Sequence, residues 1–137
     1  MPLVSIVDDE KPVRDALRRL LRAAGMQAEA FASGPEFLAS AAALRPECAV
    51  LDLHIPGMSG QEILQRIRQM DDPFPVIIVT AHDTPEARAG CLAAGAAAYL
   101  SKPLDDRLLL NAISAAIGKA AQQARRTVTH PTKETKP

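Results

Sequence analysis

Short apolar segments alternate along this chain with longer stretches in which apolar residues recur every three or four positions. The short segments predict five strands, at Leu3–Val7, Gln27–Phe31, Cys48–Asp52, Val76–Thr80 and Ala97–Ser101. Nearly continuous apolar runs such as the first are typical of strands buried on both faces of a sheet. Because a helical pattern follows every strand, the sequence predicts an α/β fold with one doubly wound, five-stranded parallel sheet in the order 2-1-3-4-5.

Helix start and stop signals divide the remaining stretches. Pro12 and Pro85 occupy first-turn positions, where the missing N–H is tolerated, and Ser59 and Glu62 have the spacing of a capping box. Gly25 and Gly95 are expected to end the first and fourth helices. We therefore predict helices over residues 11–25, 33–44, 59–70, 84–95 and 105–121.

The apolar periodicity stops after about Ala121. This boundary predicts one domain over residues 1–120, followed by a disordered tail or the start of a linker over residues 121–137. The 16 basic and 16 acidic residues of the chain balance, but five basic groups and one acidic group lie in residues 118–137. The mildly acidic body argues against direct nucleic-acid binding by this chain.

Two further compositional features concern the compartment. Cys48 and Cys91 both lie in apolar segments, which favours reduced, buried thiols over a disulfide. We find no signal peptide and no apolar run long enough to span a membrane, so we expect a cytoplasmic protein without membrane contact.

Polar residues stand where four of the five predicted strands end. Asp8 and Asp9 follow the first strand, Asp52 ends the third, Thr80 ends the fourth, and Lys102 follows the fifth. The second strand contributes nothing comparable, and in the predicted order it is an outer edge strand. Since parallel sheets of this type bind ligands at the carboxyl ends of their strands, we expect these side chains to form one site.

Three carboxylates at close range repel one another unless a cation lies among them. Oxygen ligands suit Mg²⁺ (or Mn²⁺) better than zinc, which prefers nitrogen and sulfur. A metal ion held by Asp9 and Asp52, together with Lys102, would offset the charge of an incoming phosphoryl group, and Thr80 could donate a hydrogen bond to it. Asp52 is then the candidate nucleophile of an in-line phosphoryl transfer that gives an aspartyl phosphate.

Over residues 3–118 the chain resembles the receiver (REC) domain of two-component response regulators. The resemblance rests on the strand-end residues above and on three motifs: Val-Asp-Asp-Glu, Asp-Leu-His-Ile-Pro-Gly-Met-Ser-Gly and Ala-Gly-Ala-Ala-Ala-Tyr-Leu-Ser-Lys-Pro. The sequences of these motifs are most similar to those of the FixJ type of the FixJ/LuxR-like family. The resemblance implies a flavodoxin-like (βα)5 fold and a phosphorelay partner, a sensor histidine kinase.

The resemblance also implies individual roles. Asp52 would accept the phosphoryl group, and Mg²⁺ would be bound by Asp9, Asp52 and the backbone carbonyl of His54, with Asp8 acting partly through water. Thr80-Ala81, Lys102 and the aromatic position Tyr99 would bind the phosphoryl group or switch with it. The Lys102–Pro103 bond is expected to be cis. No enzyme activity beyond self-phosphorylation and autodephosphorylation is implied.

In this family the switch changes the surface formed by the fourth helix, the fifth strand and the fifth helix, which is a usual homodimerisation face. FixJ-type receivers usually precede a LuxR-type DNA-binding domain, and about 20 residues after the fifth helix are too few for one. The output is therefore either transcription through a domain absent from this chain, or protein–protein interaction by a natural single-domain regulator.

Two alternatives concern the site itself. A haloacid dehalogenase-like phosphatase also uses a strand-end aspartate with Mg²⁺, but it needs a second acid two residues later, where this chain has His54. His54 and His82 each lie two residues after a strand-end site residue, at positions that in the receiver family tune the lifetime of the phosphoryl group. We expect them to make that lifetime depend on pH near neutrality, where imidazole titrates.

Overall fold

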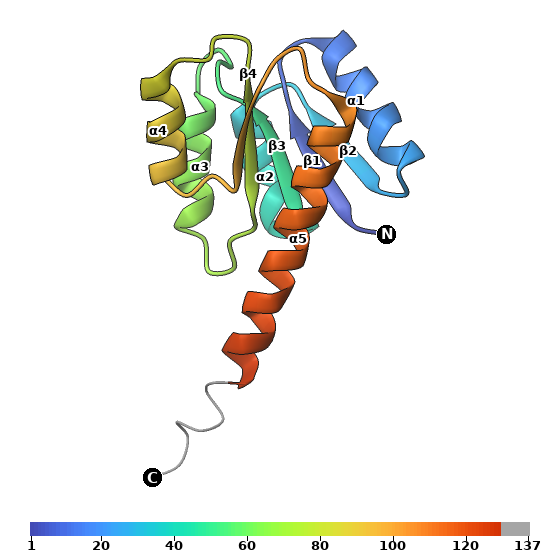
Figure 1. The fold of residues 1–137 in the computed structure, drawn as a ribbon, viewed down its shortest axis with the longest axis vertical. Coiled ribbons are helices and arrows are strands. Elements are labelled where there is room, and N and C mark those ends of the chain that lie inside the picture. Colours follow the sequence, from blue (N-terminus) through green and yellow to red (C-terminus); the bar gives the residue numbers. More distant parts are fainter. Residues whose placement is uncertain (130–137) are drawn as a thin grey trace.

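The computed structural model describes residues 1–129, and strands and helices alternate through them (Figure 1). The strands are β1 Leu3–Val7, β2 Gln27–Phe31, β3 Cys48–Asp52, β4 Val76–Thr80 and β5 Ala98–Ser101. The helices are α1 Lys11–Ala23, α2 Gly34–Leu44, α3 Gly60–Arg68, α4 Pro85–Ala93 and α5 Asp106–Thr129. All neighbouring strands are parallel and their order is β2-β1-β3-β4-β5, which confirms the predicted flavodoxin-like fold.

The sheet is buried on both faces because alternate residues of its central strands enter two separate cores. Leu51 and Ile78 pack with residues of α2, α3 and α4, whereas Val50 and Ile77 pack with residues of α1 and α5. Every residue of β3 and β4 is buried, which explains their uninterrupted apolar character. This sandwich fixes the register of the strands and therefore the positions of the residues at their ends.

The predicted helix caps are present. Ser59 accepts a hydrogen bond from the backbone N–H of Glu62, whose carboxylate accepts one from the N–H of Ser59, so the capping box is complete. Thr84 caps α4 through the N–H of Ala87. Asp105 caps α5 through the N–H of Leu108. These caps place α3, α4 and α5 directly after the loops that follow β3, β4 and β5.

The last helix is longer than the sequence analysis predicted. The predicted helix over residues 105–121 was too short, because α5 continues to Thr129 (Figure 1). Residues 122–126 are glutamine, alanine and arginine, which favour helix without an apolar face to bury. The rest of the predicted tail, residues 130–137, lies outside the described residues.

Both cysteines are free and buried, as predicted. Burial raises the pKa of the Cys48 thiol to about 12 and also raises the pKa of Cys91, so both remain protonated at neutral pH. Among residues 1–129, none of the helices combines the length and apolar character needed to cross a membrane.

Candidate functional site

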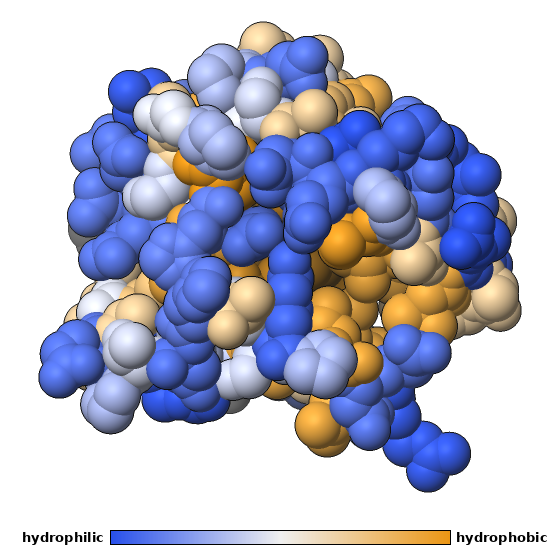
Figure 2. Space-filling model, turned by 90° about the horizontal axis from the view of Figure 1, so that it is seen from above, coloured by the Kyte–Doolittle hydropathy of each residue, from blue (hydrophilic) through white to orange (hydrophobic). Residues whose placement is uncertain are grey.

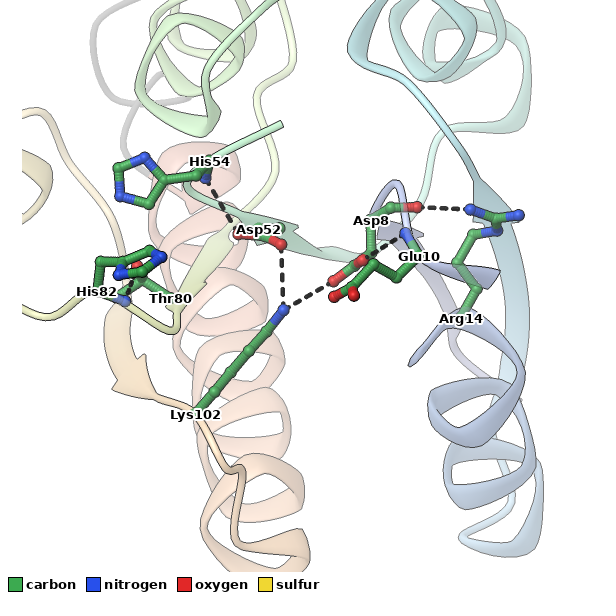
Figure 3. Close-up of polar contacts among 8 residues, drawn as sticks. All are labelled: Asp8, Glu10, Arg14, Asp52, His54, Thr80, His82 and Lys102. Carbon is green, nitrogen blue, oxygen red and sulfur yellow. Dashed lines mark hydrogen bonds and ion pairs between the residues drawn. The ribbon is translucent and has the colours of Figure 1, made fainter. Parts of the chain in front are cut away.

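The polar residues predicted from the strand ends meet at one end of the sheet (Figure 3). Asp8 follows β1, Asp52 and Thr80 are the last residues of β3 and β4, and Lys102 follows β5. Asp8, Asp52 and Thr80 are buried, and Asp9 and His54 are exposed. The outer strand β2 adds no polar side chain to this group, as its position at the sheet edge predicted.

Lys102 bridges the two buried carboxylates. Its Nζ lies 3.0 Å from Oδ2 of Asp8 and 3.1 Å from Oδ2 of Asp52 (Figure 3). Partial burial lowers the pKa of Lys102, but the hydrogen bonds and charges of Asp8 and Asp52 outweigh this effect, so the net pKa is raised. The ammonium group is therefore a fixed positive charge at the centre of the site.

The second oxygen of each buried carboxylate is held by the backbone. Asp8 Oδ1 accepts a hydrogen bond from the N–H of Glu10 at 2.9 Å, and Asp52 Oδ1 accepts one from the N–H of His54 at 3.0 Å. The guanidinium of Arg14 donates to the backbone carbonyl of Asp8 at 2.8 Å. Each carboxylate is thus oriented by Lys102 at one oxygen and by a backbone N–H at the other. These contacts keep both carboxylates in place when a charged group binds between them.

A glycine at the start of α3 allows the helix to approach Asp52 closely. A Cβ on Gly60 would lie 2.8 Å from the carbonyl oxygen of Asp52 and 2.9 Å from the Cα of Leu53. The N–H of Gly60 instead donates to the carbonyl of Leu53 at 2.9 Å. The loop after Asp52 is therefore held in place by the close packing of the end of β3 against the first turn of α3.

The acidic residues suit a hard divalent cation. One carboxylate oxygen from each of Asp8, Asp9 and Asp52 lies within 4.8 Å of the others. Mg²⁺ and Mn²⁺ bind oxygen ligands and usually keep several water molecules. The exposed position of Asp9 leaves room for such water. The position of Lys102 between two of them shows independently that these carboxylates favour a cation. The donor set fits the predicted metal.

Thr80 and the two histidines lie beside the acids. The side chain of Thr80 is fully buried, and its Oγ1 accepts a hydrogen bond from the N–H of His82 at 3.0 Å. The imidazole rings of His54 and His82 meet edge to face, with centroids 5.5 Å apart. The loops after β3 and β4 are thus in contact through these rings, which lie beside Asp52 and Thr80 (Figure 3). Ala81, between Thr80 and His82, is exposed.

Tyr99 lies on β5, and its ring is directed into the core on the side of α4. The residue is 4% exposed, and the guanidinium of Arg88 lies 4.8 Å from the ring centroid. The nearby Lys102–Pro103 peptide bond is cis, as the resemblance implied.

Sequence reasoning missed the residues that support the site. The positions of Gly60 and Arg14 within the predicted helices do not by themselves indicate contact with Asp52 or Asp8. Asp83 and Ser101, which share a hydrogen bond of 2.8 Å, are 18 positions apart and were not considered. Only the register of β4 with β5, which pairs Thr80 with Ser101, would have brought them together.

Comparison with known proteins gives a consistent picture. Residues 4–114 match the family model described as "Response regulator receiver domain". The transcriptional regulatory protein FixJ of Azorhizobium caulinodans is 33% identical over 122 residues, which cover 89% of this chain and 58% of that protein. The DNA-binding transcriptional regulator NtrC of Salmonella typhimurium is 39% identical over 103 residues, which cover 75% of this chain and 22% of that protein.

Solved structures agree. The crystal structure of FixJ-N superposes with a TM-score of 0.80 at 34% identity and covers 86% of this chain and 94% of that one. The response regulator StyR gives a TM-score of 0.83 at 34% identity and covers 97% of this chain and 67% of that one. The chain thus spans a little over half the length of the FixJ protein that it matches.

Proposed function

The chain belongs to the receiver domains of two-component response regulators, and on that premise we propose that Asp52 is the residue that accepts the phosphoryl group. The observation that carries the proposal is the meeting of Asp8, Asp9 and Asp52 with Lys102 at the carboxyl ends of the strands. We take residues 1–120 as the receiver unit, which the family match over residues 4–114 supports.

The proposed reaction is an in-line displacement. An oxygen of Asp52 attacks the phosphorus of the donor, the bond between phosphorus and the donor atom breaks, and the leaving group departs with its electron pair. Mg²⁺ (or Mn²⁺), held by Asp9, Asp52 and the carbonyl of His54 with Asp8 near it, would neutralise the transferred group. Lys102 offers a second positive charge, and Thr80 can turn its hydroxyl toward a phosphoryl oxygen.

The proposed donor is a sensor histidine kinase, so the partner is a protein. Figure 2 views the end of the molecule that holds the site: its surface is largely hydrophilic, with an apolar area to one side. Apolar surface next to a charged site suits docking of a protein better than binding of a small substrate alone. The only chemistry that we assign to the chain itself is self-phosphorylation and autodephosphorylation, in the cytoplasm.

The proposed output is transcriptional. FixJ and NtrC are transcriptional regulators, and this chain aligns with 58% and 22% of their respective lengths. The surface of α4, β5 and α5 would change on phosphorylation and pair with a second copy. A natural single-domain regulator that acts on a protein partner through the same surface is the alternative.

Acetyl phosphate tests the proposed chemistry directly. We expect the intact mass to rise by one phosphoryl group when Mg²⁺ is present and to stay unchanged when the metal is chelated. Light scattering with the phosphoryl mimic beryllofluoride separates the two outputs: a dimer supports the transcriptional one, and a monomer supports the single-domain one. An unmodified protein, or one that turns over a generic phosphate ester, would contradict the receiver assignment in favour of an inert or a phosphatase-like protein.

We propose that His54 and His82 tune the lifetime of the aspartyl phosphate, because each follows a site residue by two positions and their rings contact each other. Hydrolysis of the phosphorylated protein should vary several-fold between pH 6 and pH 8. In the double variant His54→Ala, His82→Ala this dependence should be lost, since both imidazoles are then absent. Parallel pH profiles of the two proteins, measured by decay of the phosphorylated mass, would show that the histidines have no such role.

A further inference from the structure

The hydroxyl of Tyr99 is buried without a hydrogen-bond partner within residues 1–129. The ring itself is well accommodated, because it packs with the core cluster that includes Ile78 and Cys91. A buried hydroxyl that donates to nothing has lost its water and gained no replacement, so it favours any small movement that supplies an acceptor. Such an acceptor must lie close to the Tyr99 hydroxyl.

The charged group with the largest electrostatic effect on the hydroxyl is Asp83, in the loop between β4 and α4. Burial raises the pKa of Tyr99, and the negative charge of Asp83 raises it further. The Asp83 carboxylate is already oriented: its Oδ2 accepts a hydrogen bond from Ser101 Oγ at 2.8 Å and lies 3.8 Å from the guanidinium of Arg88. Arg88 in turn covers the Tyr99 ring at 4.8 Å from its centroid.

These contacts connect three elements around one side chain. Asp83 comes from the loop that follows Thr80, Arg88 from α4, and Ser101 from β5 two residues after Tyr99. Only two residues separate Thr80 from Asp83, so a change at the Thr80 hydroxyl reaches Asp83 over a short stretch of backbone. We call Asp83, Arg88 and Ser101 the Asp83 cluster.

We propose that Asp83 is a positioning residue of the switch, whose carboxylate accepts the hydrogen bond of the Tyr99 hydroxyl and holds the ring inward. Ser101 and Arg88 orient the carboxylate for this contact, and Arg88 also closes the ring against solvent. The inference rests on the proposed function in one respect, that the position of Tyr99 is coupled to phosphorylation of Asp52.

The cluster biases the equilibrium between inward and outward Tyr99 before any phosphoryl group arrives. A conformation that is favoured in advance reacts faster with a ligand or donor that requires it, by the factor by which its population is raised. Removing Asp83 should therefore expose Tyr99 in the unmodified protein and slow the modification of Asp52 by the same mechanism.

The composition of the chain provides a direct probe of this bias. Tyr99 is the only tyrosine and the chain has no tryptophan, so tyrosine fluorescence reports on this one ring. We would measure quenching by acrylamide in the unmodified full chain and in Asp83→Ala. We expect the quenching constant to rise about twofold or more. The conservative Asp83→Asn variant, which keeps an acceptor oxygen, should restore part of the protection.

Asp72→Ala is the matched control, because Asp72 is also an exposed aspartate paired with an arginine, Arg45, and neither residue belongs to the Asp83 cluster. Its quenching constant should equal that of the original protein. If Asp83→Ala leaves Tyr99 as protected as before, or if the control exposes it equally, Asp83 does not hold the ring and the proposal is wrong.

A double-mutant cycle tests whether the hydroxyl and the carboxylate act through each other. Tyr99→Phe keeps the ring and removes the hydroxyl. The rate of Asp52 modification by acetyl phosphate should fall by a similar factor in Tyr99→Phe and Asp83→Ala, and the double variant should be no slower than either. Effects that multiply in the double variant would show independent roles and overturn the proposal. A protein that is never modified would contradict the proposed function, while the quenching result would still decide the role of Asp83.

Discussion

Replacing Asp52 by asparagine should abolish the phosphoryl mass gain completely while the protein remains folded. The amide is nearly isosteric, and its oxygen can still accept the hydrogen bond that the N–H of His54 donates at 3.0 Å. It offers no nucleophilic oxygen, however, because its lone pairs belong to a neutral carbonyl. One contact of Lys102 is lost and one repulsion among the acids is relieved, so we expect the free energy of unfolding to change by about 1 kcal/mol or less.

Intact mass after incubation with acetyl phosphate and Mg²⁺ gives the first readout, and urea unfolding gives the second. Asp72→Asn, at an exposed aspartate outside the site, should be modified as fast as the original protein. A mass gain that persists in Asp52→Asn would move the acceptor to another group, with the neighbouring carboxylates Asp8 and Asp9 as candidates, and would contradict the assignment of Asp52.

The fold and the positions of the polar residues at the strand ends were predictable from local sequence, because each position depends on a single strand end. The run from Leu3 to Val7 stops at an acidic pair, and the run before Asp52 stops at that carboxylate, so strand length alone places the side chains. Sheet order then follows from the doubly wound connection and brings these ends together. No long-range contact had to be known in advance.

Features that depend on two distant segments were not predictable in this way. The contact between His54 and His82 requires the loops after β3 and β4 to approach each other. The spacing of residues within either loop does not predict this approach. The Asp83–Ser101 hydrogen bond requires the exact register of β4 and β5. The extension of α5 to Thr129 depends on local sequence alone. It was missed because the apolar periodicity ends before the helix does, and the residues beyond that point still have high intrinsic helix propensity.

Lys102 is a cation of the chain itself that contacts both buried carboxylates of this acidic site. Asp8 and Asp52 are both buried, and in isolation their charges would oppose folding. Lys102 neutralises part of that charge in the folded chain, and a divalent cation would neutralise it again when bound. Lys102 and a divalent cation would thus bind the same carboxylates, and each would reduce the need for the other.

Replacing Lys102 by methionine should therefore destabilise the metal-free protein and make it depend on Mg²⁺. Methionine fills similar space but leaves Asp8 and Asp52 buried without their shared counter-ion, which should lower the free energy of unfolding at pH 7 by about 2–4 kcal/mol. Added Mg²⁺ should raise the urea midpoint of the variant by more than that of the original protein, because it restores a cation to the same oxygens. Modification of Asp52 should also slow, since Lys102 no longer offsets the phosphoryl charge.

The pH dependence gives an independent check with a definite sign. The pKa of Lys102 is raised above the ordinary 10.5, so the stability that its charge contributes is complete at neutral pH and disappears as the pH rises through the raised value. The stability difference between Lys102→Met and the original protein should therefore narrow only in strongly alkaline solution. Lys11→Met, which removes an exposed ion pair with Asp15, should show a small difference and no special response to Mg²⁺. If Mg²⁺ stabilises Lys102→Met no more than the original protein, the lysine and the metal do not share these carboxylates.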